Sequence, residues 1–313
     1  MYNIILDCDP GHDDAVAIMF AAASKEINLL GITCVAGNST LDNVKLNALK
    51  VCTFIKKHNI RIYAGCDKPL KRELVTADHV HGKSGLDYEG EEIIIPSNYQ
   101  IEKKNAVDFI IEQCSNLSTK IILCPTGPLT NIAHALIKKP EISKNIEKII
   151  FMGGVAKDLG NITPSAEFNI FVDPTAANIV LNSGIKTIMI GLDVTHKVLV
   201  DKEIINEILL LGNKSSIFFK DLMEFYSRFH KKKYNTSSSP LHDPCVIGYL
   251  LNPSLFKGKE TNVVVEEKSE LTLGKTVVDW FNVTNRKSNC YVVYDVKVRS
   301  FFKLLKEKIA LLP

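Results

Sequence analysis

Four aspartates lie within eight residues near the start of this sequence, at Asp7, Asp9, Asp13 and Asp14. We expect Asp7 to end a buried strand, and Gly11 allows a sharp turn from that strand into the following helix. Carboxylates this close together repel one another unless protons or a cation neutralise them. Because a set of oxygen donors selects a hard cation such as calcium or magnesium over zinc, this segment predicts a divalent-metal site.

Helix capping is the simpler explanation of the cluster, but capping accounts for one or two acids at a helix start and not for four. A metal at the end of a strand can serve two kinds of chemistry. A strand that ends in D-x-D also begins the haloacid-dehalogenase-type phosphatases, with Asp7 as the nucleophile, although Pro10-Gly11 departs from that pattern. Alternatively, the metal activates a water molecule and a carboxylate takes its proton.

Two later segments carry groups that suit the same site. Asn161, Glu167 and Asn169 follow an apolar strand and fit a polyhydroxyl ligand, unless they belong to an ordinary surface loop. His242 and Asp243 precede an apolar helix. Asp243 is therefore either a helix N-cap or a metal ligand beside a proton donor.

Apolar runs alternate with segments of helical spacing along the first two thirds of the chain. The expected strands are residues 3–7, 28–35, 61–64, 120–124, 148–152 and 186–191. The expected helices between them are residues 13–23, 41–57, 105–114, 129–136 and 174–182. This order predicts an α/β fold with an open, mostly parallel Rossmann-like sheet flanked by helices. Ligands of such sheets bind beyond the carboxyl ends of the strands, where the aspartates lie.

The last third of the chain has a different pattern. Helical runs at 202–211, 215–232 and 243–250 come first, and the last strand is expected at 291–298. Between them, residues 261–267 and 270–281 alternate and predict a C-terminal antiparallel hairpin extension. Without a repeat or a linker, residues 1–313 are expected to form a single domain. The long irregular stretch 67–99 is typical of a functional lid.

Composition argues against several kinds of partner. The net charge is +3 without a basic stripe, and Lys231-Lys232-Lys233 fits a solvated helix end, so we expect no nucleic acid. The longest apolar stretch, 15–23, is too short to span a bilayer, so we expect no membrane contact. The eight cysteines form no C-x-x-C pair and no signal peptide is recognised, which favours buried thiols and a cytoplasmic location.

Taken together, the motifs resemble those of the nucleoside hydrolase family, the inosine-uridine-preferring N-ribohydrolases, over nearly the whole chain. They are D-C-D-P-G-H-D-D (7–14), A-G-N (36–38), C-P-T-G-P-L-T-N (124–131), M-G-G (152–154), N-x-T-P-x-A-E-F-N (161–169), D-P-x-A-A (173–177), H-D-P (242–244) and G-K-T-V-V-D (274–279). The resemblance implies calcium-dependent hydrolysis of the N-glycosidic bond of ribonucleosides, giving free nucleobase and ribose for salvage. It also implies one Ca²⁺ per subunit and a homodimer or homotetramer.

The resemblance also assigns roles to individual residues. The calcium ligands would be Asp9, Asp14, the main-chain carbonyl of Thr126, and Asp243. Asp9 would also be the general base, with Asp7 supporting the turn from behind. The substrate-binding groups would be Asp13 and Asn169 at the ribose 2′-hydroxyl, Asp243 at the 3′-hydroxyl, Asn161 and Glu167 at the 5′-hydroxyl, and Asn38 and Met152 near the sugar.

Two histidines would act near the departing base. His242 would protonate it, and His81 resembles the flexible-loop histidine of relatives that use pyrimidine nucleosides or both kinds. A purely structural role stays open for each. The single tryptophan, Trp280, argues against the purine-specific group, which stacks the base between tryptophans.

The wall beside the base is expected on the long helix near residue 230. Tyr226, His230 and Tyr234 are four residues apart and would share one helix face. Pyrimidine-preferring relatives tend to carry Thr–Gln–Tyr there, so Tyr–His–Tyr leaves uridine, cytidine and inosine all open. Two alternatives compete with nucleoside hydrolysis, namely a phosphatase built on Asp7 and a non-catalytic nucleoside-binding protein.

Overall fold

The computed structural model describes residues 1–116 and 119–313 and is built around an eight-stranded sheet. The strands follow the order β3-β2-β1-β4-β5-β6-β12-β9, and neighbours pair in parallel except that β9 runs antiparallel to β12. Their bounds are β1 Tyr2–Cys8, β2 Ile27–Cys34, β3 Ile62–Ala64, β4 Ile121–Pro125, β5 Ile146–Met152, β6 Thr187–Ile190, β9 Phe256–Thr261 and β12 Cys290–Val296. The predicted mostly parallel sheet with antiparallel strands near the C-terminus is confirmed.

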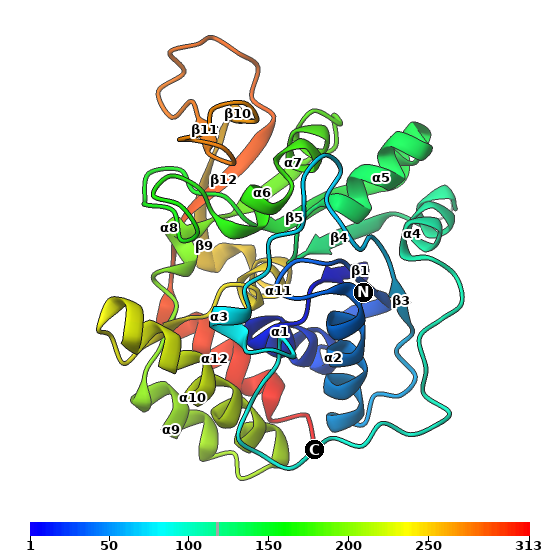
Figure 1. Cartoon of the computed structure of the whole chain (residues 1–313), viewed down its shortest axis with the longest axis vertical. Helices are drawn as coiled ribbons and strands as arrows, with labels where there is room; N and C mark the ends of the chain where they lie inside the picture. The colour runs from blue at the N-terminus through cyan, green and yellow to red at the C-terminus, as the bar shows by residue number, and fades with distance from the viewer. Residues whose placement is uncertain (117–118) are drawn as a thin grey trace.

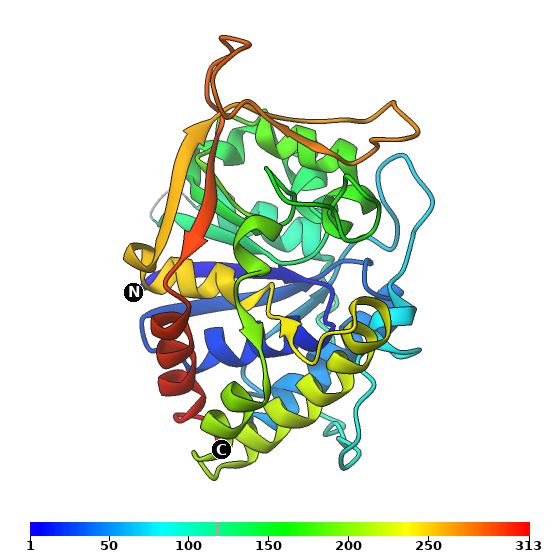
Figure 2. The same ribbon diagram turned by 90° about the vertical axis from the view of Figure 1, so that its left-hand side faces the viewer.

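Helices cover both faces of this sheet (Figures 1 and 2). Along β1, Ile4 and Leu6 join one hydrophobic cluster and Ile5 joins the other, so the strand is buried on both sides. This explains its continuous apolar run. One face carries α1 (His12–Ala23), α2 (Leu41–Phe54), α11 (Pro244–Leu251) and α12 (Val298–Ile309), and the other carries α4 (Ala106–Ser115), α5 (Thr130–Lys138) and α7 (Pro174–Leu181).

Shorter elements connect and surround these layers. The remaining helices are α3 (Asp78–His81), α6 (Phe168–Val172), α8 (Leu192–Thr195), α9 (Lys202–Leu209) and α10 (Lys214–Tyr234), with 3-10 turns at η1 (Pro140–Asn145) and η2 (Pro253–Leu255). Two small antiparallel pairs are β7 (Leu199–Val200) with β8 (Ser239–Pro240), and β10 (Val263–Val265) with β11 (Thr276–Val278). The predicted start of α7 is confirmed, because the Asp173 side chain accepts a hydrogen bond from the Ala176 backbone.

The C-terminal region differs in detail from the sequence-based expectation. The hairpin exists, but β10 and β11 form a sheet of their own, and 276–278 is the part of 270–281 that is strand. The strand that extends the main sheet is β9, whose Lys257, Lys259 and Glu260 are exposed. Such a charged edge strand lacks the apolar pattern of a buried one, so its sequence did not predict it.

The other difference lies at the end of the chain. The strand expected at 291–298 ends at Val296, and Val298 begins helix α12. The buried side chains of α12 include Phe301, Leu305 and Ile309, which recur every four residues. That spacing is helical, and it lets α12 pack beside α1.

Four further expectations concern the irregular stretch, the lysine run, the thiols and membrane-spanning helices. In the described part of the irregular stretch 67–99, α3 is the one helical turn. Lys231, Lys232 and Lys233 are exposed, as predicted for a helix end. All eight cysteines are free; seven are buried and Cys66 is half-buried. Among the described residues, no helix is both long enough and apolar enough to cross a membrane.

Candidate active site

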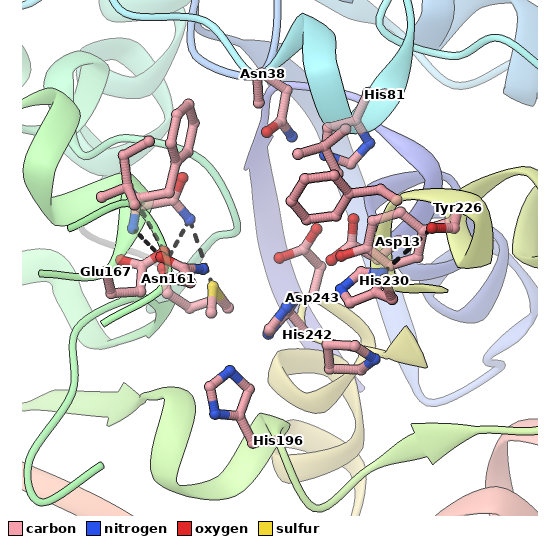
Figure 3. A pocket seen from close by; sticks show the side chains of 18 of the residues that line it. Asp13, Asn38, His81, Asn161, Glu167, His196, Tyr226, His230, His242 and Asp243 are labelled. Atoms are coloured by element: carbon pink, nitrogen blue, oxygen red, sulfur yellow. Dashed lines mark hydrogen bonds between the residues drawn. The ribbon is translucent and has the colours of Figure 1, made fainter. Parts of the chain in front are cut away.

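A cavity of about 430 Å³ lies beyond the carboxyl ends of the parallel strands. Groups that follow successive strands meet there, as the open parallel sheet predicts. The predicted site residues in its lining are Asp13, Asn38, His81, Thr126, Met152, Asn161, Glu167, Asn169, Tyr226, His230, Tyr234, His242 and Asp243 (Figure 3). Segments from Asp13 to Asp243 thus contribute to one binding space.

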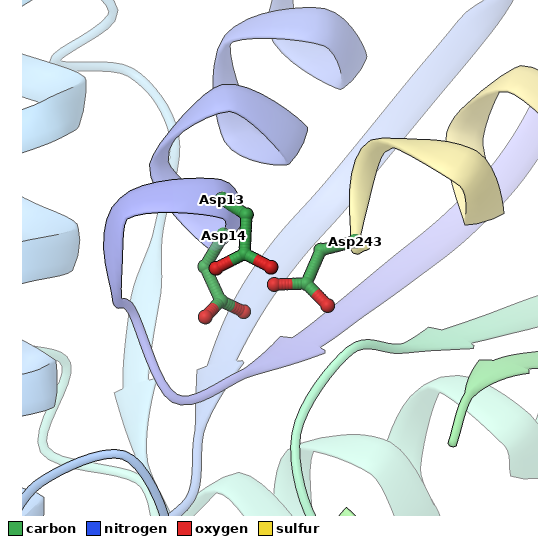
Figure 4. Close-up of side chains that lie close together, drawn as sticks. All are labelled: Asp13, Asp14 and Asp243. Atoms are coloured by element: carbon green, nitrogen blue, oxygen red, sulfur yellow. The ribbon is translucent and has the colours of Figure 1, made fainter. Parts of the chain in front are cut away.

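Three carboxylates converge on the floor of the cavity. Asp13 and Asp14 at the start of α1 and Asp243 at the start of α11 present oxygens within 4.8 Å of one another (Figure 4). Asp243 occupies the N-cap position of α11 but accepts no capping hydrogen bond within the described structure. Burial, followed by the charges of Asp13 and Asp14, raises the pKa of Asp243 well above its ordinary range. This arrangement can hold a metal ion, which would neutralise the crowded charge.

Asp14 lies directly behind the cavity lining. Its Oδ1 accepts a hydrogen bond from the Thr126 hydroxyl at 2.7 Å, and its Oδ2 accepts from the Asn38 amide at 3.2 Å. Oδ2 also accepts from the Gly11 backbone at 3.0 Å, so Asp14 caps the start of α1 as well. The capping explanation therefore applies to Asp14 but does not explain the convergence with Asp243.

Asp9 is also behind the lining, and one of its oxygens is unpartnered. Asp9 Oδ2 accepts from the Asn38 backbone N–H at 2.6 Å, whereas Oδ1 is buried with no hydrogen-bond partner among the described residues. A Cβ on Gly37 would lie 2.1 Å from Oδ2, and one on Gly127 would lie 2.6 Å from Oδ1. Both glycines are therefore needed to seat this carboxylate. An orphaned buried oxygen is costly unless something binds it.

Burial has the largest effect on the pKa of Asp9. It raises this pKa well above its ordinary range, and the charge of the neighbouring Asp14 raises it further. A raised pKa makes the carboxylate of Asp9 a stronger proton acceptor than an exposed aspartate.

Asp7 lies within β1, before the turn that carries the other three aspartates. Its Oδ1 accepts hydrogen bonds from the Thr33 hydroxyl at 2.5 Å and the Asn131 amide at 2.8 Å. Asn131 also donates to the Cys34 carbonyl at 3.0 Å, which ties β1 to β2 through α5. Burial raises the pKa of Asp7 to about 7 although both hydrogen bonds lower it. These contacts fit a support behind the site better than an attacking group.

Glu167 and Asn169 form the opposite wall. Glu167 caps α6 by accepting from the backbone N–H groups of Asn169 at 2.9 Å and Ile170 at 3.1 Å, and it also accepts from Gly154 at 2.9 Å. The Asn169 amide donates to the carbonyls of Thr126 at 2.7 Å and Met152 at 3.2 Å. Both donors of that amide therefore face protein, and its oxygen is left to meet a ligand.

The protonation of Glu167 gives a prediction about stability. Burial raises the pKa of Glu167 from 4.5 to about 7, although its backbone hydrogen bonds lower it. Because the folded-state pKa exceeds the unfolded value, the stability from this carboxyl is fully present below pH 4.5 and is lost as the pH rises through 7. At 1.36 kcal/mol per pKa unit, that loss is roughly 3 kcal/mol.

Glu167→Gln removes the titrating group. We expect the free energy of unfolding of the wild type, relative to this variant, to decrease as the pH rises from about 5 to about 8. Urea unfolding of both proteins in chelator measures the difference, with Glu207→Gln on the exposed face of α9 as the control. The same pH dependence in all three proteins would show that Glu167 does not hold a proton in the fold.

His242 lies beside Asp243, and its ring is fixed by a neighbour. Its Nδ1 is 2.7 Å from the Thr195 hydroxyl. Burial, with smaller contributions from His196 and His230, holds the pKa of His242 well below its usual range. The low pKa favours the neutral ring, and where the Thr195 hydroxyl donates to Nδ1, the one N–H of that ring is on Nε2 and can donate to a departing base.

The three residues predicted to share one face of the long helix lie on α10. α10 runs to Tyr234, so Tyr226, His230 and Tyr234 follow one another along it and all line the cavity. Tyr226 and His230 meet edge to face with centroids 4.7 Å apart. Trp280 lies outside this cavity lining, where Lys157 is 3.9 Å from its ring centroid.

The sequence analysis did not predict several of the residues that line the cavity. His196 follows β6 and pairs with Asp158 through a 2.9 Å contact, and Phe168 and Phe229 add aromatic surface. The rule that ligands bind where parallel strands end identifies His196, because it comes directly after α8 beyond β6. Nothing in the local sequence of Asp158 or Phe229 marks them, since their place depends on the fold of distant segments.

An acidic floor with hydrogen-bonding walls, at the carboxyl ends of a parallel sheet, defines a hydrolase for a sugar-containing substrate. Residues 4–303 match the family described as inosine-uridine preferring nucleoside hydrolase, and the chain belongs to that family. It is accordingly an enzyme that hydrolyses the N-glycosidic bond of ribonucleosides to free base and ribose.

Named relatives and solved structures resemble the chain over almost all of its length. A pyrimidine-specific ribonucleoside hydrolase RihA of Shewanella sp. (strain MR-7) is 45% identical over 308 residues, covering 98% of this chain and 96% of the relative. The RihA of Salmonella schwarzengrund (strain CVM19633) is 43% identical over 307 residues, covering 98% and 97%.

Two solved structures share the fold. The purine-preferring ribonucleoside hydrolase from Gardnerella vaginalis has a TM-score of 0.90 at 31% identity, covering 98% of both chains. The plant nucleoside hydrolase PpNRh1 has a TM-score of 0.91 at 29% identity, covering 99% of both.

Proposed function

We propose that this enzyme is a calcium-dependent hydrolase that prefers pyrimidine ribonucleosides. The observation that carries the calcium proposal is the convergence of Asp13, Asp14 and Asp243 beside the orphaned Oδ1 of Asp9. All of these donors are oxygens and all are buried, which suits a hard cation with several ligands. Nitrogen and sulfur donors, which zinc prefers, are absent from this set.

The ligands proposed for the ion are Asp9, Asp14, the main-chain carbonyl of Thr126, and Asp243. The Thr126 hydroxyl and the Asn169 amide support this choice, because they hold Asp14 and the Thr126 carbonyl in place. A bound calcium would orient the ribose hydroxyls and lower the pKa of a water molecule. Asp13 lies close enough to bind the same ion but is assigned to the sugar.

Different side chains then take the proton of the water and bind the hydroxyls of the ribose. Asp9 Oδ1 takes the proton of the attacking water, since it has no other partner among the described residues. Asp13 and Asn169 bind the 2′-hydroxyl, and Asp243 binds the 3′-hydroxyl. Breaking the bond builds positive charge on the ribose, which the buried carboxylates stabilise.

The remaining wall residues bind the 5′ end and the base. Asn161 and Glu167 take the 5′-hydroxyl, with Asn38 and Met152 near the sugar. His242 donates to the departing base, and His81, Tyr226, His230 and Tyr234 contact it.

The preference for pyrimidines rests on the named relatives. The two RihA proteins, at 45% and 43% identity, are named pyrimidine-specific, whereas the purine-preferring structure is 31% identical. The position of Trp280 outside the cavity lining also supports this preference, because no tryptophan lies where it would stack on a purine. Inosine is proposed as a poorer substrate.

Two observations weigh against the alternatives stated at the outset. A phosphatase needs Asp7 to attack its substrate, but Asp7 is held within β1 by the hydrogen bonds that its Oδ1 accepts from Thr33 and Asn131. A protein that only binds nucleosides does not fit the match of residues 4–303 to a family of nucleoside hydrolases.

A substrate panel tests the proposal. Release of reducing sugar is measured from uridine, cytidine, inosine and adenosine, before and after treatment with chelator, and after calcium is restored. We expect uridine and cytidine to be fastest, chelation to abolish turnover and calcium to restore it. Full activity in chelator would contradict the calcium proposal, and a preference for purine nucleosides would contradict the proposed specificity. Release of phosphate from a phosphate ester serves as the negative control.

Four wider properties are also proposed. Residues 1–313 act as one catalytic unit, which the contribution of Asp9 and Asp243 to one site supports. The enzyme works as a homodimer or homotetramer in the cytoplasm, in nucleoside salvage. The free thiols support a reducing compartment.

A further inference from the structure

Asn47 is a polar residue on the buried face of α2. Val44, Ala48, Val51 and Cys52 on the same face are hydrophobic and 0% exposed, and Asn47 is 1% exposed among them. An amide in such surroundings destabilises the fold unless protein groups replace its hydrogen bonds with water. Neither the sequence motifs nor the roles proposed above include Asn47, so its hydrogen-bond partners indicate its task.

The amide group of Asn47 connects two segments of the active site. Its nitrogen donates to the main-chain carbonyl of Pro10 at 3.1 Å and to that of Ser84 at 2.8 Å. Because a carbonyl oxygen only accepts, both partners require the NH₂ group of the amide on this side. Pro10 lies in the turn that carries Asp9, and Ser84 lies in the segment that follows His81.

The oxygen of the same amide has no partner. Asn47 Oδ1 is buried and accepts no hydrogen bond from the described residues. A buried acceptor without a partner destabilises a fold, and an apolar side chain of the same shape would avoid this cost. The stability of α2 therefore does not account for the amide, whereas the bridge between Pro10 and Ser84 does.

Residues 81–87 form a turn that is closed by its own hydrogen bonds. Asp87 accepts from the backbone N–H groups of Lys83 at 3.0 Å and Ser84 at 3.1 Å, and its own N–H donates to the His81 carbonyl at 3.2 Å. These bonds determine the shape of the turn but not where it lies on the molecule. Any movement of the whole turn also moves His81, which lines the cavity.

Two asparagines on successive turns of α2 hold the 81–87 turn from outside. The Lys83 carbonyl accepts from the Asn43 amide at 3.1 Å, and this contact is open to solvent. The Ser84 carbonyl accepts from Asn47, whose side chain is buried. A Cβ on Gly85 would lie 3.3 Å from the Asn47 amide nitrogen, so the backbone of the turn lies directly against α2.

We propose that Asn47 is a positioning residue that holds the 81–87 turn, and with it His81, beside the 9–14 turn before a nucleoside binds. A wall that is already in position binds its ligand more tightly than one that the ligand must first order. Asn47 lies outside the cavity lining, so it contributes to substrate affinity without contacting the substrate. The kinetic part of this inference rests on the proposed function.

Hydrogen exchange of the unliganded protein tests the structural part of the inference. Asn47→Leu fills a similar space but donates to neither carbonyl. We expect the backbone amides of residues 83–87 to exchange about tenfold faster in this variant, since one hydrogen bond contributes roughly that factor to a local opening equilibrium. The contacts of the turn with Asn43 and with the His12 ring remain, so the turn is loosened and not released. Unchanged exchange of these amides would overturn the inference, whatever the kinetics.

The kinetic effect depends on the fraction of molecules in which the turn is in position. If that fraction falls to about a tenth, the apparent affinity for the nucleoside falls about tenfold. We therefore expect KM for uridine to rise about tenfold in Asn47→Leu while kcat stays within about twofold, because the bound complex keeps the same groups. Assays at saturating calcium separate this effect from a change in metal binding. A wild-type KM despite faster exchange would overturn the positioning role.

Asn145→Leu is the matched control. Asn145 is 2% exposed and outside the cavity lining, and its amide also donates to two carbonyls, those of Asn116 and Thr119. The control should lower the melting temperature at least as much as Asn47→Leu and leave both KM and the exchange of residues 83–87 unchanged. An equal rise of KM in the control would show a general loss of structure and would overturn the positioning role.

Asn47→Ser is a second, smaller variant for the case that leucine prevents folding. Its hydroxyl can donate to one of the two carbonyls, so exchange and KM should both rise, by less than about tenfold. Wild-type values of both would overturn the inference. If the wild type itself hydrolyses no nucleoside, the proposed function fails, whereas hydrogen exchange still decides the role of Asn47.

Discussion

Asp9→Asn is expected to lower kcat/KM for ribonucleosides by roughly 10³-fold or more, because loss of a general base alone costs about 10²–10⁴-fold. The substitution keeps the shape of the side chain and the acceptor for the Asn38 backbone. It removes the negative charge and places an amide where the unpartnered Oδ1 lies. An amide neither takes a proton from water nor neutralises a cation, so calcium binding should weaken as well.

Asp7→Asn, two positions earlier on the same strand, is the matched control. The amide oxygen of the variant can still accept from Thr33 and Asn131, so the turn keeps its support. We expect kcat/KM to stay within about tenfold of the wild type, with a stability cost of about 1–3 kcal/mol from the new buried amide. Steady-state kinetics, calcium calorimetry and thermal unfolding measure the three effects.

The two variants distinguish the competing chemistries. Near-normal turnover in Asp9→Asn would mean that the base and the metal ligand are assigned to the wrong carboxylate. Phosphate release from a phosphate ester by the wild type that is lost in Asp7→Asn, with a stable fold and normal calcium binding, would make Asp7 the reacting group, as the phosphatase alternative requires.

The sequence predicted the central sheet because burial on both faces leaves a direct trace in composition. Ile4, Ile5 and Leu6 pack into two different clusters, so the central positions of β1 must be apolar. The edge strand β9 leaves no such trace, since its charged residues face solvent. α12 was missed because Val298 continues the apolar pattern of β12, and the change from strand to helix depends on packing against α1.

The candidate site divides in the same way. Charged and amide groups that follow strands were recognised, because a parallel sheet brings the ends of its strands together. The contacts that orient them were not predictable from local sequence. Thr195 and His242 are 47 residues apart, and His12 and His81 are 69 residues apart. Only the fold shows that such pairs share a hydrogen bond.

The second large effect is expected for His242→Ala. The low pKa favours a neutral ring whose Nδ1 faces the Thr195 hydroxyl, and with that hydroxyl as the donor the Nε2–H of His242 can support a departing base. Hydrogen bonding from His242 to the departing base matters most when the leaving group is a poor one. We expect kcat to fall by roughly 10²-fold for uridine and inosine, and by less than about tenfold for 4-nitrophenyl riboside, whose leaving group needs no proton.

Thr195→Val tests whether the orientation of the ring contributes to this effect. It removes the hydroxyl that fixes Nδ1 of His242 but leaves the imidazole in the wall, so the loss should be intermediate and should show the same dependence on the leaving group.

If His242 instead only packs against the substrate, its removal raises KM for all three substrates alike and leaves the ratio of their kcat values unchanged. Equal losses of kcat on uridine and on 4-nitrophenyl riboside would likewise show that His242 does not assist the departing base. The tilted contact of the His242 ring with His196, whose centroid is 5.9 Å away, would then make His196 the next candidate for that task.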